Sequence, residues 1–387
     1  KAAEKAVSLL EPGSTLLARW LPVFFVPSLV VLPLSPAPSA ANAAKLLLLV
    51  FGGWFVSLAS TAAVVATLSA PASSTTTATA TVASATPSKP PPPAFRGPLI
   101  RRLGAGALAS GVLAVLGASG RAPSALAKMA KPLAQVSMLS ATLFGFTAGT
   151  RVPRGISKAV HPLVTCTAVA MATAGAIGKG FGLGFADMLR TYVTKSRCPV
   201  HLGAGDLLLG LLGPSVLSFA VQMYRRRTLI FKNAKQVAGG SIFCASSGLF
   251  GTALASRLLG LPEALRLATL PRNITSPLAM AICGMVGADA SLAIAIVVIT
   301  GVIGANFGAT VLDALGVKEP AARGLAQGGS AHGLGTAAMV NEPTAFAFSA
   351  VAMALTATAS TVLVSIPAVR SALLTVALGA AVGVPAS

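Results

Sequence analysis

Two short polar runs, PRNITSP (Pro271–Pro277) and GGSAHGLGT (Gly328–Thr336), interrupt the hydrophobic stretch Leu270–Pro367. In lipid, backbone N–H and C=O groups have no water to bond, so an interrupted helix persists only where it is buried in protein or lines a wet cavity. Paired broken helices are a sequence indicator of the binding site in secondary transporters. The stretch therefore predicts a membrane carrier, and a soluble enzyme is not expected.

The composition is that of a membrane protein. Hydrophobic residues make up 54% of the 387 residues, charged residues make up 10%, and the mean hydropathy is +0.80. Apolar stretches that approach the bilayer-spanning length of about 20 residues recur along the chain. No alternating strand pattern is visible. We therefore expect an all-α polytopic membrane protein with about ten to twelve hydrophobic segments, including broken or re-entrant helices.

The basic residues indicate contact with membrane lipid. Lys and Arg number 29 against 9 Asp and Glu, which gives a net charge of +20. Most basic residues lie between hydrophobic runs, as in Arg101-Arg102 and Arg225-Arg226-Arg227. This is the pattern of short loops that contact anionic head groups. No zinc-finger or RNA-recognition signature is present, so nucleic-acid binding is not expected.

No catalytic residue, metal site or cofactor is expected. The four cysteines share no Cys-x-x-Cys spacing, and three of them lie inside apolar runs, where a cysteine usually acts as a small hydrophobe. Nothing resembles a nucleotide-binding loop, which disfavours an ATP-driven pump. An intramembrane enzyme would need a catalytic pairing that the sequence lacks.

The chain is expected to consist of two membrane modules and a linker. Residues 70–98 are rich in Pro, Ser, Thr and Ala and predict a flexible linker. Residues 1–69 contain two hydrophobic spans and begin without Met, so we expect this module to be incomplete at its N-terminus. Residues 99–387 form the second module, which divides near Arg227–Lys235 into two halves that favour an inverted repeat.

The first polar run predicts a carboxylate site. A charge inside the membrane usually marks an ion path or an internal partner, and the guanidinium of Arg272 presents a planar fork that suits a carboxylate. Asn273, Thr275 and Ser276 supply neutral donors, and Pro277 suits the first turn of a following helix, whose N-terminal amides also favour anions. The alternative is that Arg272 extends from a segment end to the lipid head groups.

The second polar run predicts another part of the same site. Its candidate residues are Ser330, His332, Gly333, Gly335 and Thr336. Glycines let backbone approach a ligand, although small residues also mediate ordinary helix packing in membranes. A histidine titrates near neutral pH, so His332 is a candidate both for anion binding and for proton coupling. The alternative is a buried histidine with satisfied hydrogen bonds.

Four further polar positions are weaker candidates. Gly213, Pro214 and Ser215 predict either a third broken segment or a plain proline-kinked helix, with Asp206 upstream as a candidate proton site. Asn306 is an isolated amide among small residues, where helix packing is the favoured interpretation. Glu342, followed by Pro343, is either a proton site or an exposed charge at a helix start.

Several runs resemble the CidB/LrgB family. These are SAHGLGTAA (Ser330–Ala338), ARG (Ala322–Gly324), FAFSAVAMALT (Phe346–Thr356), LPRNITSPLAM (Leu270–Met280) and ITGVIGANFG (Ile299–Gly308). RWLPVFFVPSLVVLP (Arg19–Pro33) resembles the latter part of a CidA/LrgA-type module. Residues 1–69 and 99–387 would then be an LrgA-like and an LrgB-like module.

A fusion of these two modules is similar to the glycolate/glycerate carriers of the chloroplast inner envelope. The resemblance implies a photorespiratory carrier that exports glycolate and imports glycerate, with the anion held between the two broken segments. Proton coupling and a homodimer are further expectations. The alternative is a holin-like pore or a regulator of murein hydrolases, as the bacterial relatives were first described. A pore would conduct without saturation, whereas a carrier would saturate and show counter-exchange.

Overall fold

The computed structural model describes residues 2–69, 95–120, 122–152, 162–194, 196, 198 and 201–379. Every regular element in these residues is a helix, so the expected all-α fold is confirmed for the described part of the chain. Residues 70–94, which make up most of the expected linker, lie outside it. The linker's last four residues are described, and Gly97 already begins a helix.

Six described helices are long and apolar enough to cross a membrane, or seven if a bent pair within residues 7–34 is counted as one span. They are Ala40–Leu68, Gly97–Ala118, Pro162–Gly180, Ala234–Leu258, Ala290–Ala314 and Pro343–Ser365. Ser276–Val286 and Pro367–Leu378 are shorter apolar helices. The larger expected number of segments stays a prediction.

The chain folds into two compact units, one made of Lys1–Leu68 and Leu209–Ser387 and the other of Ser69–Leu208. We call them unit 1 and unit 2. The predicted modules, 1–69 and 99–387, are defined by family resemblance and not by packing. Their boundaries stay a prediction. The division into units shows that residues 1–68 fold together with the second half of the chain.

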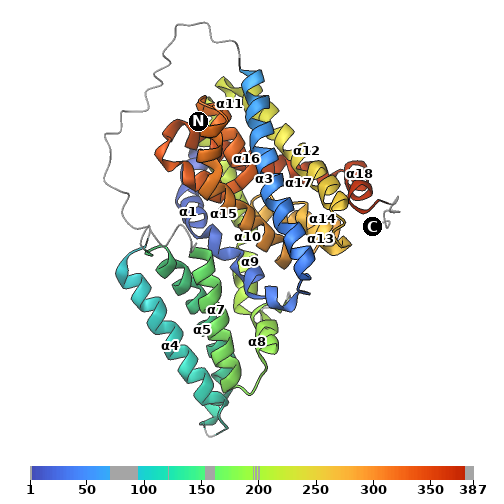
Figure 1. Ribbon diagram of the computed structural model, residues 1–387. Helices are drawn as coiled ribbons and strands as arrows, with labels where there is room; N and C mark the ends of the chain where they lie inside the picture. Colours follow the sequence, from blue (N-terminus) through green and yellow to red (C-terminus); the bar gives the residue numbers. More distant parts are fainter. Residues whose placement is uncertain are drawn as a thin grey trace. The chain divides into compact units, whose positions relative to one another are not determined.

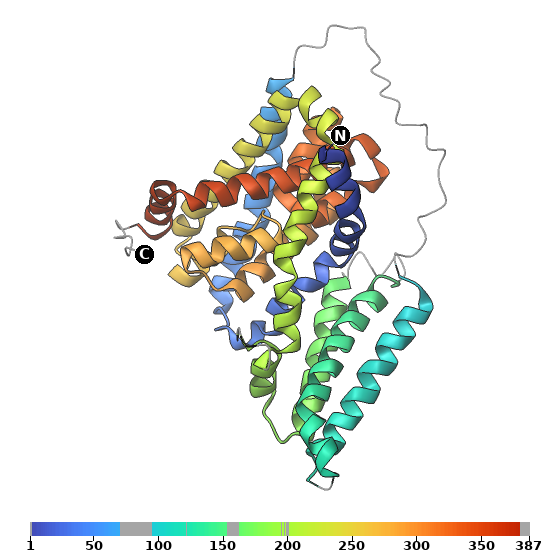
Figure 2. The ribbon, with the colours of Figure 1, turned by 180° about the vertical axis from the view of Figure 1, so that it is seen from behind.

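Unit 1 contains fourteen described elements (Figure 1). They are α1 (Ala2–Phe24), α2 (Val26–Val30), η1 (Leu32–Leu34), α3 (Ala40–Leu68), α10 (Leu212–Arg225), α11 (Arg227–Lys232), α12 (Ala234–Leu258), α13 (Glu263–Thr269), α14 (Ser276–Val286), α15 (Ala290–Ala314), α16 (Pro320–Ala338), η3 (Met339–Asn341), α17 (Pro343–Ser365) and α18 (Pro367–Leu378). At its periphery α1 lies alongside α10, where the Ser14 hydroxyl donates to the Ser218 carbonyl at 3.3 Å (Figure 2).

The core of unit 1 surrounds α16, which contacts α3, α12, α15 and α17. Residues 321–332 are all buried. Small residues allow this close packing: a Cβ atom on Gly324 or Gly328 would collide with the carbonyl oxygens of Ala345 and Ser349 on α17. Glycine at these two positions therefore allows α16 to pack closely against α17.

The predicted interruption of α16 is confirmed, and the chain turns at His332. This residue has φ 43° and ψ −139°, and it is the only described residue other than glycine with a positive φ. The chain reverses there, because Arg323 and Glu342 form hydrogen bonds of 2.7 Å although they are 19 residues apart. In a continuous helix this separation would span about 28 Å. Residues 320–342 therefore form a helical hairpin with His332 at its tip.

The described helices of unit 2 are α4 (Gly97–Ala118), α5 (Ser124–Gly149), α7 (Pro162–Gly180), α8 (Phe185–Tyr192) and α9 (Ala204–Gly210). The last two residues of α9 already count as part of unit 1. α5 packs against both α4 and α7. The Ser137 hydroxyl donates to the Ala107 carbonyl at 2.7 Å, and a Cβ atom on Gly145 would meet the backbone of Cys166.

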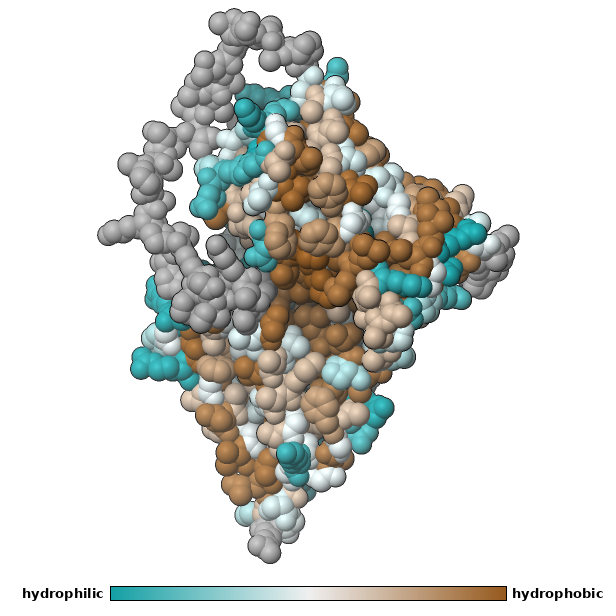
Figure 3. Space-filling view, in the orientation of Figure 1, coloured by the Kyte–Doolittle hydropathy of each residue, from teal (hydrophilic) through white to brown (hydrophobic). Residues whose placement is uncertain are grey.

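The surface of α3 matches a membrane environment. Its large exposed side chains are apolar: Leu47, Leu48, Phe51, Phe55, Val56 and Leu68. Figure 3 shows hydrophobic residues gathered on the face on which α3 lies. Exposed apolar area of this kind is stable against lipid, so the surface agrees with the spanning length of the helix.

Candidate functional site

The first interruption is a buried loop between α13 and α14. α13 ends at Thr269, and α14 begins at Ser276 with a proline in its first turn. The predicted break is therefore confirmed. All residues from Leu270 to Ser276 are buried, and two turns hold the loop: Arg272 N–H donates to the Thr269 carbonyl at 3.1 Å and Ile274 N–H to the Pro271 carbonyl at 2.9 Å.

Arg272 lies inside unit 1, with 2% of its surface exposed. Its Nη2 donates to the Gly53 carbonyl at 2.7 Å and to the Ser57 hydroxyl at 2.9 Å. Its Nε donates to the Thr252 hydroxyl at 2.9 Å. The guanidinium does not reach the surface of unit 1 here, which speaks against an arginine that extends to the head groups.

The charge of Arg272 is left without an acidic partner among the residues that the structure describes. Its hydrogen-bond partners are neutral, and Nη1 is buried with no hydrogen-bond partner. A buried charge is costly unless it is paired, and an unsatisfied donor of a charged group adds to that cost. An anion bound at Nη1 would relieve both.

A cavity of about 420 Å³ lies between α3 and α12, beside Arg272. Most of its lining is apolar or glycine, and its polar side chains are Ser57, Ser60, Ser247, Thr252 and Arg272. An apolar pocket with a few polar groups is typical of a small-molecule site. All of its lining residues belong to unit 1.

Asn273 connects the two interruptions. Its Nδ2 donates to the Gly329 carbonyl at 3.2 Å and lies 3.8 Å from the Cys244 sulfur. Gly248 on α12 gives it room, since a Cβ atom there would come within 2.6 Å of this nitrogen. The other amide atom, Oδ1, has no described partner. The two polar runs therefore touch through one side chain.

The next two predicted residues lie at the start of α14. The carbonyl of Thr275 accepts the N–H groups of Leu278 and Ala279 at 3.0 Å each, so Thr275 occupies the N-cap position. Thr275 and Ser276 are 6% and 3% exposed. Neither belongs to the described lining of the cavity at Arg272.

The predicted residues of the hairpin bond other parts of unit 1 and are not among the described lining of that cavity. His332 Nε2 lies 2.9 Å from the Val297 carbonyl on α15, and the ring fills the space beside Gly301. The Ser330 hydroxyl donates to the Ala326 carbonyl, and Thr336 bonds both the His332 carbonyl and Ser349. None of these residues, nor Gly333 or Gly335, is among the described lining.

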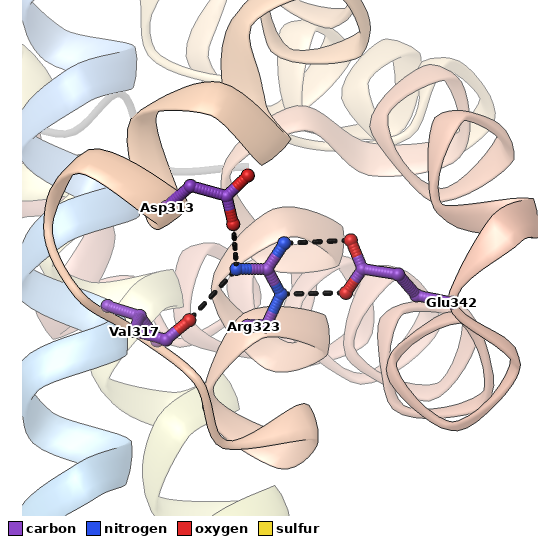
Figure 4. Close-up of polar contacts among 4 residues, drawn as sticks. All are labelled: Asp313, Val317, Arg323 and Glu342. Atoms are coloured by element: carbon purple, nitrogen blue, oxygen red, sulfur yellow. Dashed lines mark hydrogen bonds and ion pairs between the residues drawn. The ribbon is translucent and has the colours of Figure 1, made fainter.

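Glu342 is held by an arginine that the sequence analysis did not select. Arg323 binds both carboxylate oxygens of Glu342 at 2.7 Å, and its Nη1 donates to Asp313 at 2.7 Å and to the Val317 carbonyl at 2.9 Å (Figure 4). Glu342 also occupies the N-cap position of α17. The cluster thus closes the open end of the hairpin and fixes it to α15.

None of the weaker candidates is among the described lining of the cavity at Arg272. Gly213 and Pro214 are exposed near the start of α10, and the Ser215 hydroxyl donates to the Leu211 carbonyl at 2.7 Å. Asn306 is exposed and donates to Val302 of its own helix at 2.9 Å. In unit 2 the Asp206 carboxylate caps a turn by accepting the N–H groups of Thr194 and Gly203, each at 2.9 Å.

The residues that surround Arg272 were not predicted from the sequence. Gly53 and Ser57 come from α3, which precedes Arg272 by more than 200 residues. Ser247 and Thr252 come from α12. Glycine, serine and threonine are common in ordinary helix interfaces in membranes, so their sequence positions carry no separate signal.

Comparison with known proteins places this architecture in a family. Residues 142–369 match the model of the LrgB-like family. The chain belongs to the LrgB-like family. This LrgB-like protein is 39% identical, over 97% of its length and 71% of the relative's, to plastidal glycolate/glycerate translocator 1, chloroplastic, of Arabidopsis thaliana.

Two bacterial relatives of this LrgB-like protein are named only as uncharacterized proteins. It is 30% identical to the uncharacterized protein YxaC of Bacillus subtilis, over 41% of its own chain and 69% of the relative. It is 26% identical to an uncharacterized protein of Haemophilus influenzae, over 57% of its own chain and 90% of the relative. No solved structure matches the chain.

Proposed function

We propose that this protein is a secondary transporter that moves small 2-hydroxy monocarboxylates, with glycolate leaving and glycerate entering across the chloroplast inner envelope. The name of the Arabidopsis relative supports this substrate class and a chloroplast location. Membrane lipid surrounds the apolar helices, and a homodimer supplies the fixed surface against which a carrier moves.

The observation that carries the proposal is the state of Arg272. This buried guanidinium has only neutral partners among the described residues, its Nη1 is buried without a hydrogen-bond partner, and the residue lines a cavity. An arginine N–H group binds a carboxylate through short, charge-assisted hydrogen bonds. The substrate carboxylate binds Nη1 in the cavity between α3 and α12. This cavity has room for a small acid and several water molecules.

The two broken segments serve the transport cycle. Asn273 joins the Arg272 loop to the hairpin, so movement of the hairpin changes the surroundings of the anion. Alternating access then follows from the movement of one group of helices against another, in a fold built from inverted repeats with ten to twelve segments. Residues at the hairpin tip, His332 foremost, couple this movement to a proton.

The conformation of His332 supports a functional role at the tip. Non-glycine residues with positive φ of this kind cost about 1–3 kcal/mol, and such strain gathers at functional sites. A glycine would adopt the same turn without strain. This backbone conformation favours glycine, yet the position holds a histidine.

Counter-exchange in liposomes tests the proposal. Purified protein is reconstituted, the vesicles are loaded with glycolate, and uptake of labelled glycerate is measured against external concentration. A carrier gives saturable uptake that depends on internal glycolate. A holin-like pore, the alternative that the LrgB-like family keeps open, gives uptake that rises linearly and ignores the internal acid.

A further inference from the structure

One hydroxyl group in the lining of the cavity at Arg272 forms no hydrogen bond in the part of the chain that the structure describes. Ser247 lines the cavity from α12, and its Oγ is buried without a hydrogen-bond partner. A buried hydroxyl without a partner costs free energy, so such a group needs an explanation. A serine in a helix usually donates to the carbonyl four residues earlier, which Ser247 does not do here.

The other hydroxyl groups of the cavity already have partners. Ser57 and Thr252 each accept a hydrogen bond of 2.9 Å from Arg272. Ser60 donates to the Val56 carbonyl at 2.6 Å, on its own helix. Among the polar side chains that line the described cavity, Arg272 and Ser247 therefore each have one buried polar atom without a hydrogen-bond partner, Nη1 and Oγ respectively.

We infer that Ser247 recognises the 2-hydroxyl group of the substrate, while Arg272 holds its carboxylate. This inference rests on the proposed function and names the residue that would separate 2-hydroxy acids from plain carboxylic acids. A site with a polar group placed for a substrate hydroxyl rejects the analogue that lacks it, because the protein group is then left unpaired.

Ser247 lies near the residue of α12 that holds Arg272. Ser247 and Thr252 are five residues apart, about 7.5 Å along the helix axis, and the Thr252 hydroxyl accepts a hydrogen bond of 2.9 Å from Arg272 Nε. Gly251, one turn after Ser247, leaves this space open: a Cβ atom there would meet nothing within 4 Å.

The test compares two acids in the reconstituted full chain. Competition by glycolate and by acetate against labelled glycolate uptake gives the preference for the 2-hydroxyl group. We expect Ser247→Ala to weaken the apparent affinity for glycolate about threefold to tenfold, which is the contribution of one neutral hydrogen bond. The apparent affinity for acetate should stay unchanged. Ser256→Ala is the matched control, because its hydroxyl donates to the Ala253 carbonyl of the same helix α12 and lies outside the described cavity lining. Ser247→Thr keeps a hydroxyl and should keep the preference.

The outcomes separate this inference from the proposed function. If Ser247→Ala keeps the wild-type preference for glycolate over acetate, the inference is wrong and the carrier stands. If the wild-type protein exchanges neither acid, the proposed function is wrong and the inference goes with it. Should the alanine variant fail to fold, Ser247→Cys keeps the volume with a much weaker hydrogen-bonding group, and the same loss of preference is expected.

Discussion

The side-chain amide of Asn273 donates to the Gly329 carbonyl at 3.2 Å and thereby joins the loop of Arg272 to the hairpin α16. Both groups are buried, so no water replaces this bond if it is lost. The contact makes the two interruptions of the membrane segment one structural unit. A movement of either interruption must break it or carry the other along.

Asn273→Ala should therefore destabilise unit 1. The Gly329 carbonyl loses a buried donor, at a cost of about 1–3 kcal/mol, and the melting temperature in detergent should fall. Asn306→Ala is the control, since that amide is exposed and bonds only its own helix. A melting temperature that is equal for both variants would contradict the importance of the connection.

Substitution of two neighbouring glycines should separate close packing at Arg272 from general effects on α3. A Cβ atom on Gly53 would lie 2.9 Å from Cζ and Nη2 of Arg272, whereas one on Gly52 would meet nothing within 4 Å. Gly53→Ala should displace the guanidinium and lower glycolate exchange at least about tenfold, as the loss of one charged hydrogen bond would do. Gly52→Ala should exchange normally. Normal exchange by Gly53→Ala would show that the position of Arg272 is not critical.

The cluster at the open end of the hairpin should contribute to stability. Glu342→Gln removes one charge from a pair that is bidentate and partly buried, so we expect a loss of about 1–2 kcal/mol in the free energy of unfolding. Asp187→Asn is the matched control in unit 2, where the pair with Arg190 is 2.7 Å long but well exposed on both sides. Its loss should be within about 0.5 kcal/mol. Equal losses would mean that the hairpin does not depend on the cluster.

His332 should give transport its pH dependence. If the imidazole binds its proton together with the substrate anion, apparent affinity falls as pH rises through the titration range of histidine. His332→Gln keeps a hydrogen-bonding group and the strained turn but should flatten the pH profile. His332→Gly should flatten it as well, because it removes the imidazole while glycine still adopts the positive φ of the turn. A pH profile that survives both substitutions would assign His332 to packing.

The two interruptions were predictable from the sequence because they combine Pro and Gly with polar residues inside an apolar stretch. The partners of the predicted residues were not. Ser330 and Thr336 were expected to face a substrate, but helical geometry lets their hydroxyls bond nearby backbone carbonyls. The contribution of α3 to the Arg272 site depends on a contact across more than 200 residues, which no local pattern encodes.

The pairing of Arg323 with Glu342 was hidden for a different reason. Their separation of 19 residues places them at opposite ends of a continuous helix, and only the reversal at His332 brings them together. The sequence indicated that the helix breaks, but it did not indicate that the chain folds back.

The Arg272→Lys variant tests the central claim most directly, with saturable uptake of labelled glycerate into glycolate-loaded liposomes as the measurement. A lysine keeps the charge but has three N–H donors instead of five, too few to replace the bonds to Thr252, Gly53 and Ser57 and also bind the carboxylate, so exchange should fall more than tenfold while the melting temperature stays near wild type. Arg266→Lys, which alters an arginine bonded to backbone carbonyls and outside the described cavity lining, should exchange normally. Wild-type rate and affinity in correctly folded Arg272→Lys would contradict the assignment of Arg272 as the carboxylate ligand.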